Sequence, residues 1–335
     1  MLSFLLRRLL FAIPTLALIS ALVFFMIDLA PGSPMSEIPL TVPPEVRAQI
    51  LAAMGADQPA PLRYFLWVRQ IVWSEPLHGL DAALGTSLAG DAPRMISWQS
   101  KVPVFGLIAE RLPQTLTVIG GGYLLGVLLA LPLGMRAAAR RGGIFDHVTT
   151  FLSALVIAMP GFLIAQVLIL VFAVKLGWFP SVYDTNLQVR DGAGLYRMVM
   201  QMALPVIVLA LFNCAEIGRY TRAAVLEQLG QDYTRTARAK GLTDGRVLRV
   251  HVLRNAMAPV VTIVALGLPA IFGGAMVIEQ IFRINGIGAA LIGAIQVGDL
   301  PVIQTITFLY AVLIVLSNLL ADLLYAVLDP RVVHG

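Results

Sequence analysis

The sequence predicts an all-α polytopic membrane protein, with six transmembrane helices and an external segment between the first two of them. Of its 335 residues, 58% are hydrophobic and only 13% are charged. Soluble domains contain roughly 45–50% apolar and about 25% charged residues, so the composition argues against a soluble globular protein. The apolar residues also gather in six nearly uncharged runs, and about 20 such residues are needed to cross a bilayer.

The six runs differ in how they end. The first stops at Asp28, which lies near the outer end of its helix and is expected to reach water. The third is interrupted by Met-Pro-Gly, and the fourth is short, so the turn that carries Glu216 and Arg219 is expected to extend it. The predicted helices cover residues 9–27, 112–135, 148–174, 198–215, 255–278 and 300–321.

The distribution of Lys and Arg predicts the orientation of these helices. The short segments on one side contain 14 of these residues, whereas those on the other side contain four. Because cytoplasmic loops carry the excess of positive charge, both termini are predicted to be cytoplasmic. The N-terminal residues are expected to form a signal anchor, since their charges precede a full-length helix. The single cysteine, Cys214, excludes an intrachain disulfide and a cysteine-rich metal site.

Three regions follow from this topology. Residues 1–30 are expected to form a cytoplasmic tip and the first transmembrane helix, and residues 31–111 the external segment. Residues 112–335 then form the core with the other five helices. The core includes a long cytoplasmic loop, 217–254, in which charged residues are concentrated.

Two external segments are expected to be ordered. One helix is predicted over residues 44–54, and an amphipathic helix over 62–73 carries Trp67 and Trp73. Trp favours the membrane–water boundary, although a helix packed on the transmembrane helices fits the second pattern equally well. The apolar stretch 284–297 has only 14 residues, too few to cross the bilayer, and is expected to be re-entrant or interfacial.

The cytoplasmic loop is patterned as two helices around a glycine. Asp232 is expected to be the N-cap of the first helix, and Gly241 to end it with a hydrophobic contact from Leu242. Thr243 is the expected N-cap of a second helix that runs into the fifth span. The first helix is too short to be stable alone, so it must pack against something. Its basic residues fit a docking helix, a solvated face that sets topology, or a lipid-binding face.

Several motifs resemble one known family. The segment "QDYTRTARAKGL", followed by "LRNA" and Pro259, is similar to the cytoplasmic coupling loop of binding-protein-dependent ABC importer permeases, in the oligopeptide/dipeptide branch. Of that loop's general pattern, only Ala237, Gly241 and Leu253 survive. The resemblance covers nearly the whole chain and departs from the family in a longer external segment. The other matching stretches are "FLLRRLLFAIPTLALIS", "LAPGSP", "MGADQPAPLRYFLW", "LGTS", "ERLPQTL", "VYD", "IEQIFRINGIG" and "DLLYAVLDPRV".

The resemblance implies a type I ABC importer permease fold and a set of partners. A second, homologous permease subunit would line the other half of the pathway in the bacterial inner membrane. Two cytoplasmic ATPase subunits would bind ATP and Mg, and an extracytoplasmic solute-binding protein would deliver a peptide; no nucleic acid is involved. The residues implied to couple to the ATPase are Asp232, Tyr233, Arg235, Thr236, Ala237, Arg238, Ala239, Lys240, Gly241, Leu242 and Arg246.

Polar residues within the spans are candidates for the translocation path, because burying them costs free energy. These are Asn213, Glu279, Gln280 and Gln304. Asn213 could equally bond a neighbouring helix. Glu279 could meet the amino group of a peptide, but an interhelical pair or a pair with Arg283, four residues on, is favoured. Separately, Gly122 and Gly126 form a small-residue face suited to helix contact.

The sequence shows no catalytic constellation. It lacks a P-loop, an H-E-x-x-H motif and a nucleophile elbow. Its histidines, His78, His147, His251 and His334, are scattered rather than spaced as metal ligands. The chain is therefore expected to be a non-catalytic subunit without a cofactor of its own. The alternatives are an importer of the same class for a nickel chelate or glutathione, and a secondary transporter, which mid-span acidic residues would have favoured.

Overall fold

The computed structural model describes residues 2–29, 45, 58–269 and 276–328. Within these ranges the chain forms helices and no β-strand, apart from one isolated bridge between Ile96 and Pro103. Five helices are long and apolar enough to cross a membrane, or up to seven if each of two bent helix pairs counts as one span. The all-α membrane architecture is confirmed, while the count of six remains a prediction. The expected helix over 44–54 lies outside the described residues, except for Glu45.

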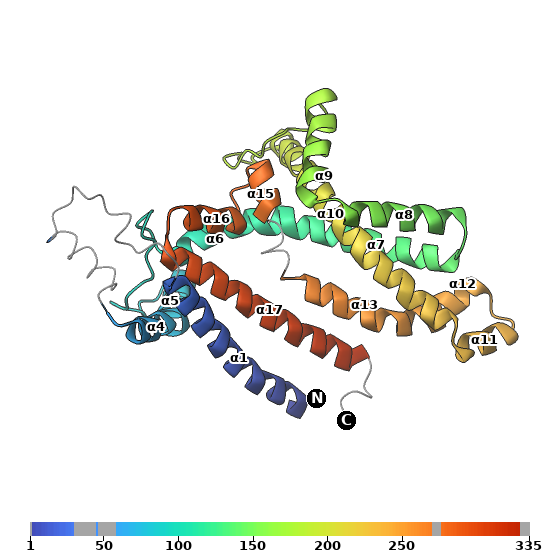
Figure 1. Cartoon of the computed structure of the whole chain (residues 1–335), viewed down its shortest axis with the longest axis horizontal. Coiled ribbons are helices and arrows are strands. Elements are labelled where there is room, and N and C mark those ends of the chain that lie inside the picture. Colours follow the sequence, from blue (N-terminus) through green and yellow to red (C-terminus); the bar gives the residue numbers. More distant parts are fainter. Residues whose placement is uncertain (1, 30–44, 46–57, 270–275, 329–335) are drawn as a thin grey trace. The chain divides into compact units, whose positions relative to one another are not determined.

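The chain divides into two compact units. The first comprises Met1–Leu9, Gln114–Gly288 and Leu313–Gly335, and the second Leu10–Pro113 and Ala289–Val312. Helices α7, α8 and α10 lie side by side in the first unit, and α11 follows the end of α10 (Figure 1). The helices of the first unit are α7 (Gly121–Ala139), α8 (Ile144–Ala158), α9 (Gly161–Leu168), α10 (Gly192–Leu229), α11 (Asp232–Ala239), α12 (Asp244–Arg246), α13 (Leu253–Gly267) and α15 (Met276–Phe282).

The other described α-helices lie in the second unit or contribute to both. In the second unit, α4 (Ala60–Arg69) and α5 (Glu75–Leu84) are joined by the π-helical turn η1 (Gln70–Ser74). The helices that contribute residues to both units are α1 (Leu2–Asp28), α6 (Val104–Thr115), α16 (Ile287–Gln296) and α17 (Leu300–Leu328). Of three further π-helical segments, η2 (Leu116–Gly120) joins α6 to α7, η4 (Val247–Val252) joins α12 to α13, and η3 (Ile169–Lys175) continues α9 to its end.

Helices α7 and α10 pack with their backbones in close contact. A Cβ atom at Gly126 would lie 2.6 Å from the Cβ of Asn213, and one at Gly134 would lie 2.6 Å from the Gly218 carbonyl oxygen. Gly122 faces α10 in the same way. The predicted small-residue face is therefore confirmed and extends by a third glycine. Such residues let membrane helices approach each other closely, where the hydrophobic effect gives no drive for association.

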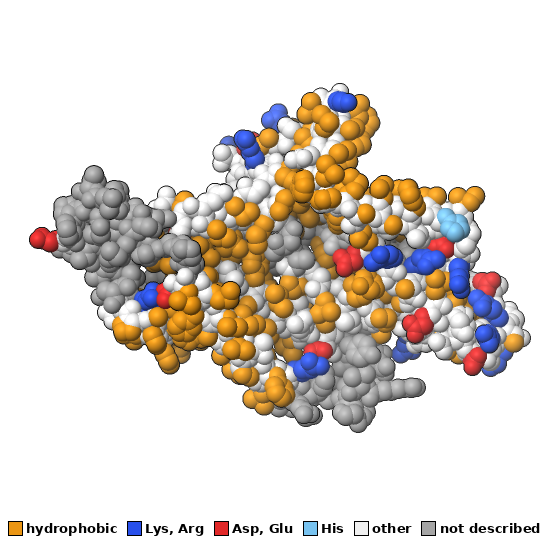
Figure 2. All heavy atoms as spheres, viewed as in Figure 1, with side chains coloured by type: hydrophobic (Ala, Val, Ile, Leu, Met, Phe, Trp, Pro, Cys, Tyr) orange, Lys and Arg blue, Asp and Glu red, His pale blue; other side chains and the backbone are white. Residues whose placement is uncertain are grey.

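The surface of the first unit has an apolar part and a charged end. Leu124, Leu128 and Phe151 are each at least 58% exposed, as expected of side chains that face lipid. On the face in Figure 2, many charged side chains gather at the end of this unit that carries α11 and α12. This pattern agrees with the Lys and Arg asymmetry of the sequence.

The predicted third span is two helices rather than one. Helices α8 and α9 meet at an angle of 105°. Met159 has an extended backbone, with φ −93° and ψ 137°, because the following Pro160 excludes the helical conformation. The expected interruption is confirmed, and it is a sharp bend.

Helix α4 packs through aromatic side chains. Trp67 is buried and lies against Phe24, Tyr64 and Phe308. The Asp28 side chain stays 14% exposed, and Arg63 of α4 forms an ion pair with its carboxylate at 2.6 Å. This pair ties α4 to the end of α1, which the sequence pattern of either helix alone does not reveal.

The stretch 284–297 contains a short helix. This helix, α16, follows α15 after a turn in which Arg283 has a positive φ of 56°. The two helices meet at 89°. Together the two helices are long and apolar enough to form one bent span or a re-entrant loop, so the predictions that this stretch does not cross the bilayer and that it is re-entrant remain predictions.

The polar loop after α10 has the two predicted helices. Gly241 adopts a φ of 80°, its N–H bonds the Arg238 carbonyl at 2.9 Å, and the Leu242 N–H bonds the Ala237 carbonyl at 3.3 Å. These two bonds form a Schellman motif, which satisfies the last carbonyls of α11. Thr243 is the N-cap of α12, as predicted.

The start of α11 differs from the prediction. Gln231, not Asp232, is the N-cap, and no side chain bonds the free N–H groups there. Asp232 is the first helical residue. Its carboxylate is still favourable at this position, because the N-terminus of a helix carries partial positive charge.

The contact between α7 and α10 predicts a strict size limit at Gly134. Gly134→Ala places a methyl group against backbone that no side-chain rotation can relieve, so we expect destabilisation of about 1–3 kcal/mol. The measurement is the thermal unfolding midpoint of the detergent-solubilised protein. Gly120→Ala is the control, because a Cβ there meets nothing within 4 Å. Equal midpoints for the two variants would contradict the packing.

The positive φ of Gly241 predicts that a substitution there strains the backbone, although the new Cβ atom clashes with nothing. A Cβ at this position meets nothing within 4 Å, so Gly241→Ile acts through the backbone alone and costs about 1–2 kcal/mol. We expect roughly 5- to 30-fold faster hydrogen exchange at the end of α11, measured by mass spectrometry. Gly245→Ala, in α12, is the control and should leave this exchange unchanged. Unaltered protection in Gly241→Ile would refute the role of the left-handed cap.

Candidate functional site

Helix α11 buries one face against its own chain. Thr234 and Ala237 are buried, and Ala237 belongs to an apolar cluster with Val225 of α10, Val247 of η4 and Val252 of η4. The Thr234 hydroxyl donates to the Leu229 carbonyl at 2.9 Å. The short helix is therefore stabilised by tertiary packing, as its length requires.

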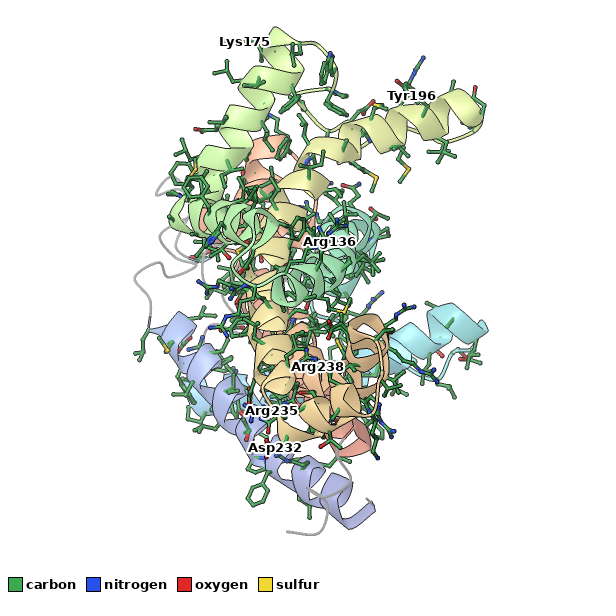
Figure 3. The ribbon with its side chains drawn as sticks, turned by 90° about the vertical axis from the view of Figure 1, so that its right-hand side faces the viewer. Arg136, Lys175, Tyr196, Asp232, Arg235 and Arg238 are labelled. Atoms are coloured by element: carbon green, nitrogen blue, oxygen red, sulfur yellow. The ribbon has the colours of Figure 1, made fainter. Side chains whose placement is uncertain are left out.

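The opposite face of α11 is exposed and charged. The Arg235 side chain is 74% exposed and pairs with Asp232 at 3.6 Å. Arg238 donates from Nε to Asp244 of α12 at 2.9 Å. Figure 3 shows Asp232, Arg235 and Arg238 together on α11, far from Lys175 and Tyr196. Exposed pairs of this kind contribute only about 0–1 kcal/mol, so the guanidinium groups stay available to another partner.

The other expected coupling residues fall into two groups. Exposed side chains are those of Thr236, Ala239, Lys240 and Arg246, together with Gly241. Tyr233 is half-buried, and its hydroxyl bonds Gln228 at 2.7 Å. Ala237 is only 6% exposed and Leu242 packs on the same cluster. The Ala237 methyl group therefore faces the core of its own chain, and the part of Ala237 in coupling remains a prediction.

An ion pair that the sequence did not indicate lies close to this segment. Arg222 of α10 binds Asp146 of α8 through two bonds, Nε to Oδ1 at 2.5 Å and Nη2 to Oδ2 at 2.8 Å. The Gly142 N–H donates to the same carboxylate at 2.9 Å. The Asp146 side chain is only 4% exposed. Neither residue stands out in the sequence, because both read as ordinary charges at helix ends.

A cavity of about 170 Å³ lies between α7, α8 and α10 beside this ion pair. Its lining is mostly apolar and includes Leu133, Val156 and Leu211, with Cys214 and Arg222 on its wall. Across the described part of the chain, no group of three or more His, Cys, Asp or Glu side chains is arranged to hold a metal ion.

Glu279 is buried by its own chain. It is 1% exposed, and the Thr115 hydroxyl donates to its carboxylate at 3.0 Å. A Cβ at Gly286 would overlap this carboxylate at 2.1 Å, so glycine is required there. Of the two favoured alternatives, the interhelical one is confirmed by the bond from Thr115 of α6. The i+4 pair with Arg283 is wrong, because Arg283 is exposed and no ion pair among the described residues joins the two. The carboxylate instead holds the turn after α15, where the Ile287 N–H bonds Thr115 at 2.9 Å.

The other candidate path residues have different surroundings. Asn213 is half-buried against Gly126 and donates to the Leu209 carbonyl of its own helix at 2.8 Å. Gln280 is exposed on α15. Gln304 is 7% exposed on α17 within the second unit. Of these side chains, only that of Gln280 is open to solvent in this chain alone.

Comparison with known proteins gives two family matches. Residues 130–334 match the family described as binding-protein-dependent transport system inner membrane component. Residues 1–119 match the N-terminal part of the membrane component of the same transport systems. Together the two matches span both the external segment and the loop that contains α11.

Full-length relatives give the same result. An oligopeptide transport system permease protein of Bacillus subtilis is 36% identical over 336 residues, covering 99% of each chain. A dipeptide transport system permease protein of Escherichia coli K12 and a di/tripeptide transport system permease protein of Pseudomonas aeruginosa are each 36% identical, covering 100% of this chain and 99% of their own. The chain therefore belongs to the family of multi-pass inner membrane components of binding-protein-dependent transport systems.

Proposed function

We propose that this chain is a permease subunit of an ATP-driven ABC importer for peptides and forms half of the translocation pathway. The relatives that cover its full length are named for oligopeptides, dipeptides and di/tripeptides. The observation that carries the coupling role is the geometry of α11, a helix fixed to its own core on one face and open on the other.

In this proposal α11 is the coupling helix. Thr234 and Ala237 hold it to the chain, so a force on its outer face moves α10 with it. Arg235, Arg238 and Lys240 meet acidic groups on an ATPase, since arginine offers a rigid fork for carboxylates. Gly241 lets the chain turn back toward the membrane immediately after the contact.

The remaining partners follow from the family. A second, homologous permease completes the pathway, and two cytoplasmic ATPase subunits bind ATP and Mg and hydrolyse the nucleotide. A solute-binding protein delivers the peptide from outside. Both termini lie in the cytoplasm in this arrangement, which the excess of Lys and Arg on their side supports.

The direct test is to identify what purifies with the chain. The full-length protein is tagged at its C-terminus, extracted from native membranes in mild detergent and analysed by mass spectrometry. We expect two P-loop ATPases and a second multi-span protein. A lone chain or homo-oligomer that transports in liposomes without ATP would instead identify a secondary transporter.

Uptake by whole cells then tests the substrate class. Cells that lack the gene and cells that carry it are compared for accumulation of a labelled dipeptide. Unlabelled di- and oligopeptides should compete with this uptake. Competition by a nickel chelate or by glutathione, without competition by peptides, would assign the same machinery to another solute.

The charged face of α11 predicts a loss of coupling on charge reversal. Arg235→Glu combined with Arg238→Glu replaces two expected ion pairs by repulsion, and each such interfacial pair is worth roughly 2–5 kcal/mol. We therefore expect uptake and ATPase co-purification to fall at least about tenfold, with unchanged amounts of the chain in the membrane. Arg190→Glu, at the other end of α10, is the matched control. Normal uptake by the double variant would refute this contact.

A further inference from the structure

The helices around α10 are attached to it in two different ways. Helix α7 is interlocked with α10 through glycines whose backbones touch it, as at Gly134. Helix α8 is separated from α10 along part of its length by the cavity, which Thr149 and Ser153 of α8 line with Gly218 of α10. The contact with α7 is therefore rigid, whereas the contact with α8 leaves room for movement.

One ion pair bridges this looser contact. Among the described residues, the side chains of α8 and α10 bond each other directly through Asp146 and Arg222. The two-bond fork fixes both the distance and the angle between the groups. The Gly142 N–H adds a third bond to the carboxylate. We name Gly142, Asp146 and Arg222 the α8 clamp.

Arg222 is also connected to the coupling segment. It lies about two helical turns before Leu229, the last residue of α10. Only Gly230 and Gln231 separate α10 from α11, and the Thr234 hydroxyl bonds the carbonyls of Leu229 and Gln231 at 2.9 and 2.7 Å. A displacement of α11 is therefore transmitted along α10 to Arg222, and through the clamp to the start of α8.

From this geometry we propose that the α8 clamp is a positioning element that makes α8 move with α10 when the ATPase displaces α11. This inference rests on the proposed function, because the displacement comes from the ATPase. Asp146 and Arg222 contact neither solute nor nucleotide in this mechanism. They determine which helix follows the coupling segment.

The chain contains a natural reporter for this movement. Cys214 is its only cysteine, is half-buried and lies on the wall of the cavity between α8 and α10. If α8 moves relative to α10, access to the Cys214 thiol changes. The rate of its modification by N-ethylmaleimide therefore reports the position of α8 without knowledge of the transported solute.

The experiment uses the complex purified through the tag on this chain. The variants are Asp146→Asn, and Asp146→Asn combined with Arg222→Gln. The double variant removes both charges, so neither is left buried without its partner. It therefore separates loss of the ion pair from the destabilisation caused by an unpaired charge. Arg141→Gln is the control, because this exposed arginine adjoins Gly142 and undergoes the same substitution as Arg222. Labelling is measured without nucleotide, with ATP and Mg, and with a non-hydrolysable ATP analogue, together with ATP hydrolysis.

Without nucleotide, we expect both clamp variants to label Cys214 roughly tenfold faster or more than the wild type, since loss of a buried pair shifts a local opening by at least that factor. In the wild type and in Arg141→Gln, ATP should change the labelling rate. In the double variant this change should disappear while ATP hydrolysis continues. A purely structural pair would reduce the yield of complex without removing the response to ATP.

Two negative outcomes are distinguishable. If ATP alters labelling in the wild type and equally in the double variant, the clamp proposal is overturned and the proposed function stands. If no ATPase co-purifies and ATP changes nothing in the wild type, the proposed function fails and the coupling role of the clamp fails with it.

Discussion

The close contact between the backbones of α7 and α10 is the constraint on which the rest of the first unit depends. Helix α10 has 38 residues and is about 57 Å long at 1.5 Å per residue. A helix of this length needs a rigid packing partner to move as one body. The glycines at positions 122, 126 and 134 provide it by removing the side chains that would hold the helices apart. The place of α11 relative to the apolar helices follows from this support.

The α8 clamp and the glycine contact differ in what they contribute. Burying an ion pair is weak evidence for stability, because desolvation offsets much of the attraction. Its geometry is nevertheless specific, because a fork between Arg222 and Asp146 is satisfied at one distance and one angle. A cavity beside it costs packing energy that a purely structural contact would recover. The arrangement therefore suits a contact at which α8 and α10 can move relative to each other better than a rigid core contact.

The sequence predicts features that depend on neighbouring residues better than contacts between residues that are far apart in the chain. The cap at Gly241 and the bend at Pro160 were predictable, because each depends on the conformation of one residue and its neighbours. Pairing of Arg222 with Asp146 spans 76 residues, and that of Thr115 with Glu279 spans 164. Such pairs depend on how helices pack, which no periodicity encodes. The inward direction of Ala237 was missed for the same reason.

The structure also bears on which partner the exposed face of α11 suits. The sequence left three interpretations open, among them a basic face that binds anionic lipid. In the structure Asp232 and Asp244 are interleaved with Arg235 and Arg238, and each acid lies within 4 Å of an arginine. A uniformly negative membrane surface would be repelled by these carboxylates. A protein surface that presents both signs of charge matches such a face, so the geometry favours a shaped protein groove over a lipid headgroup layer.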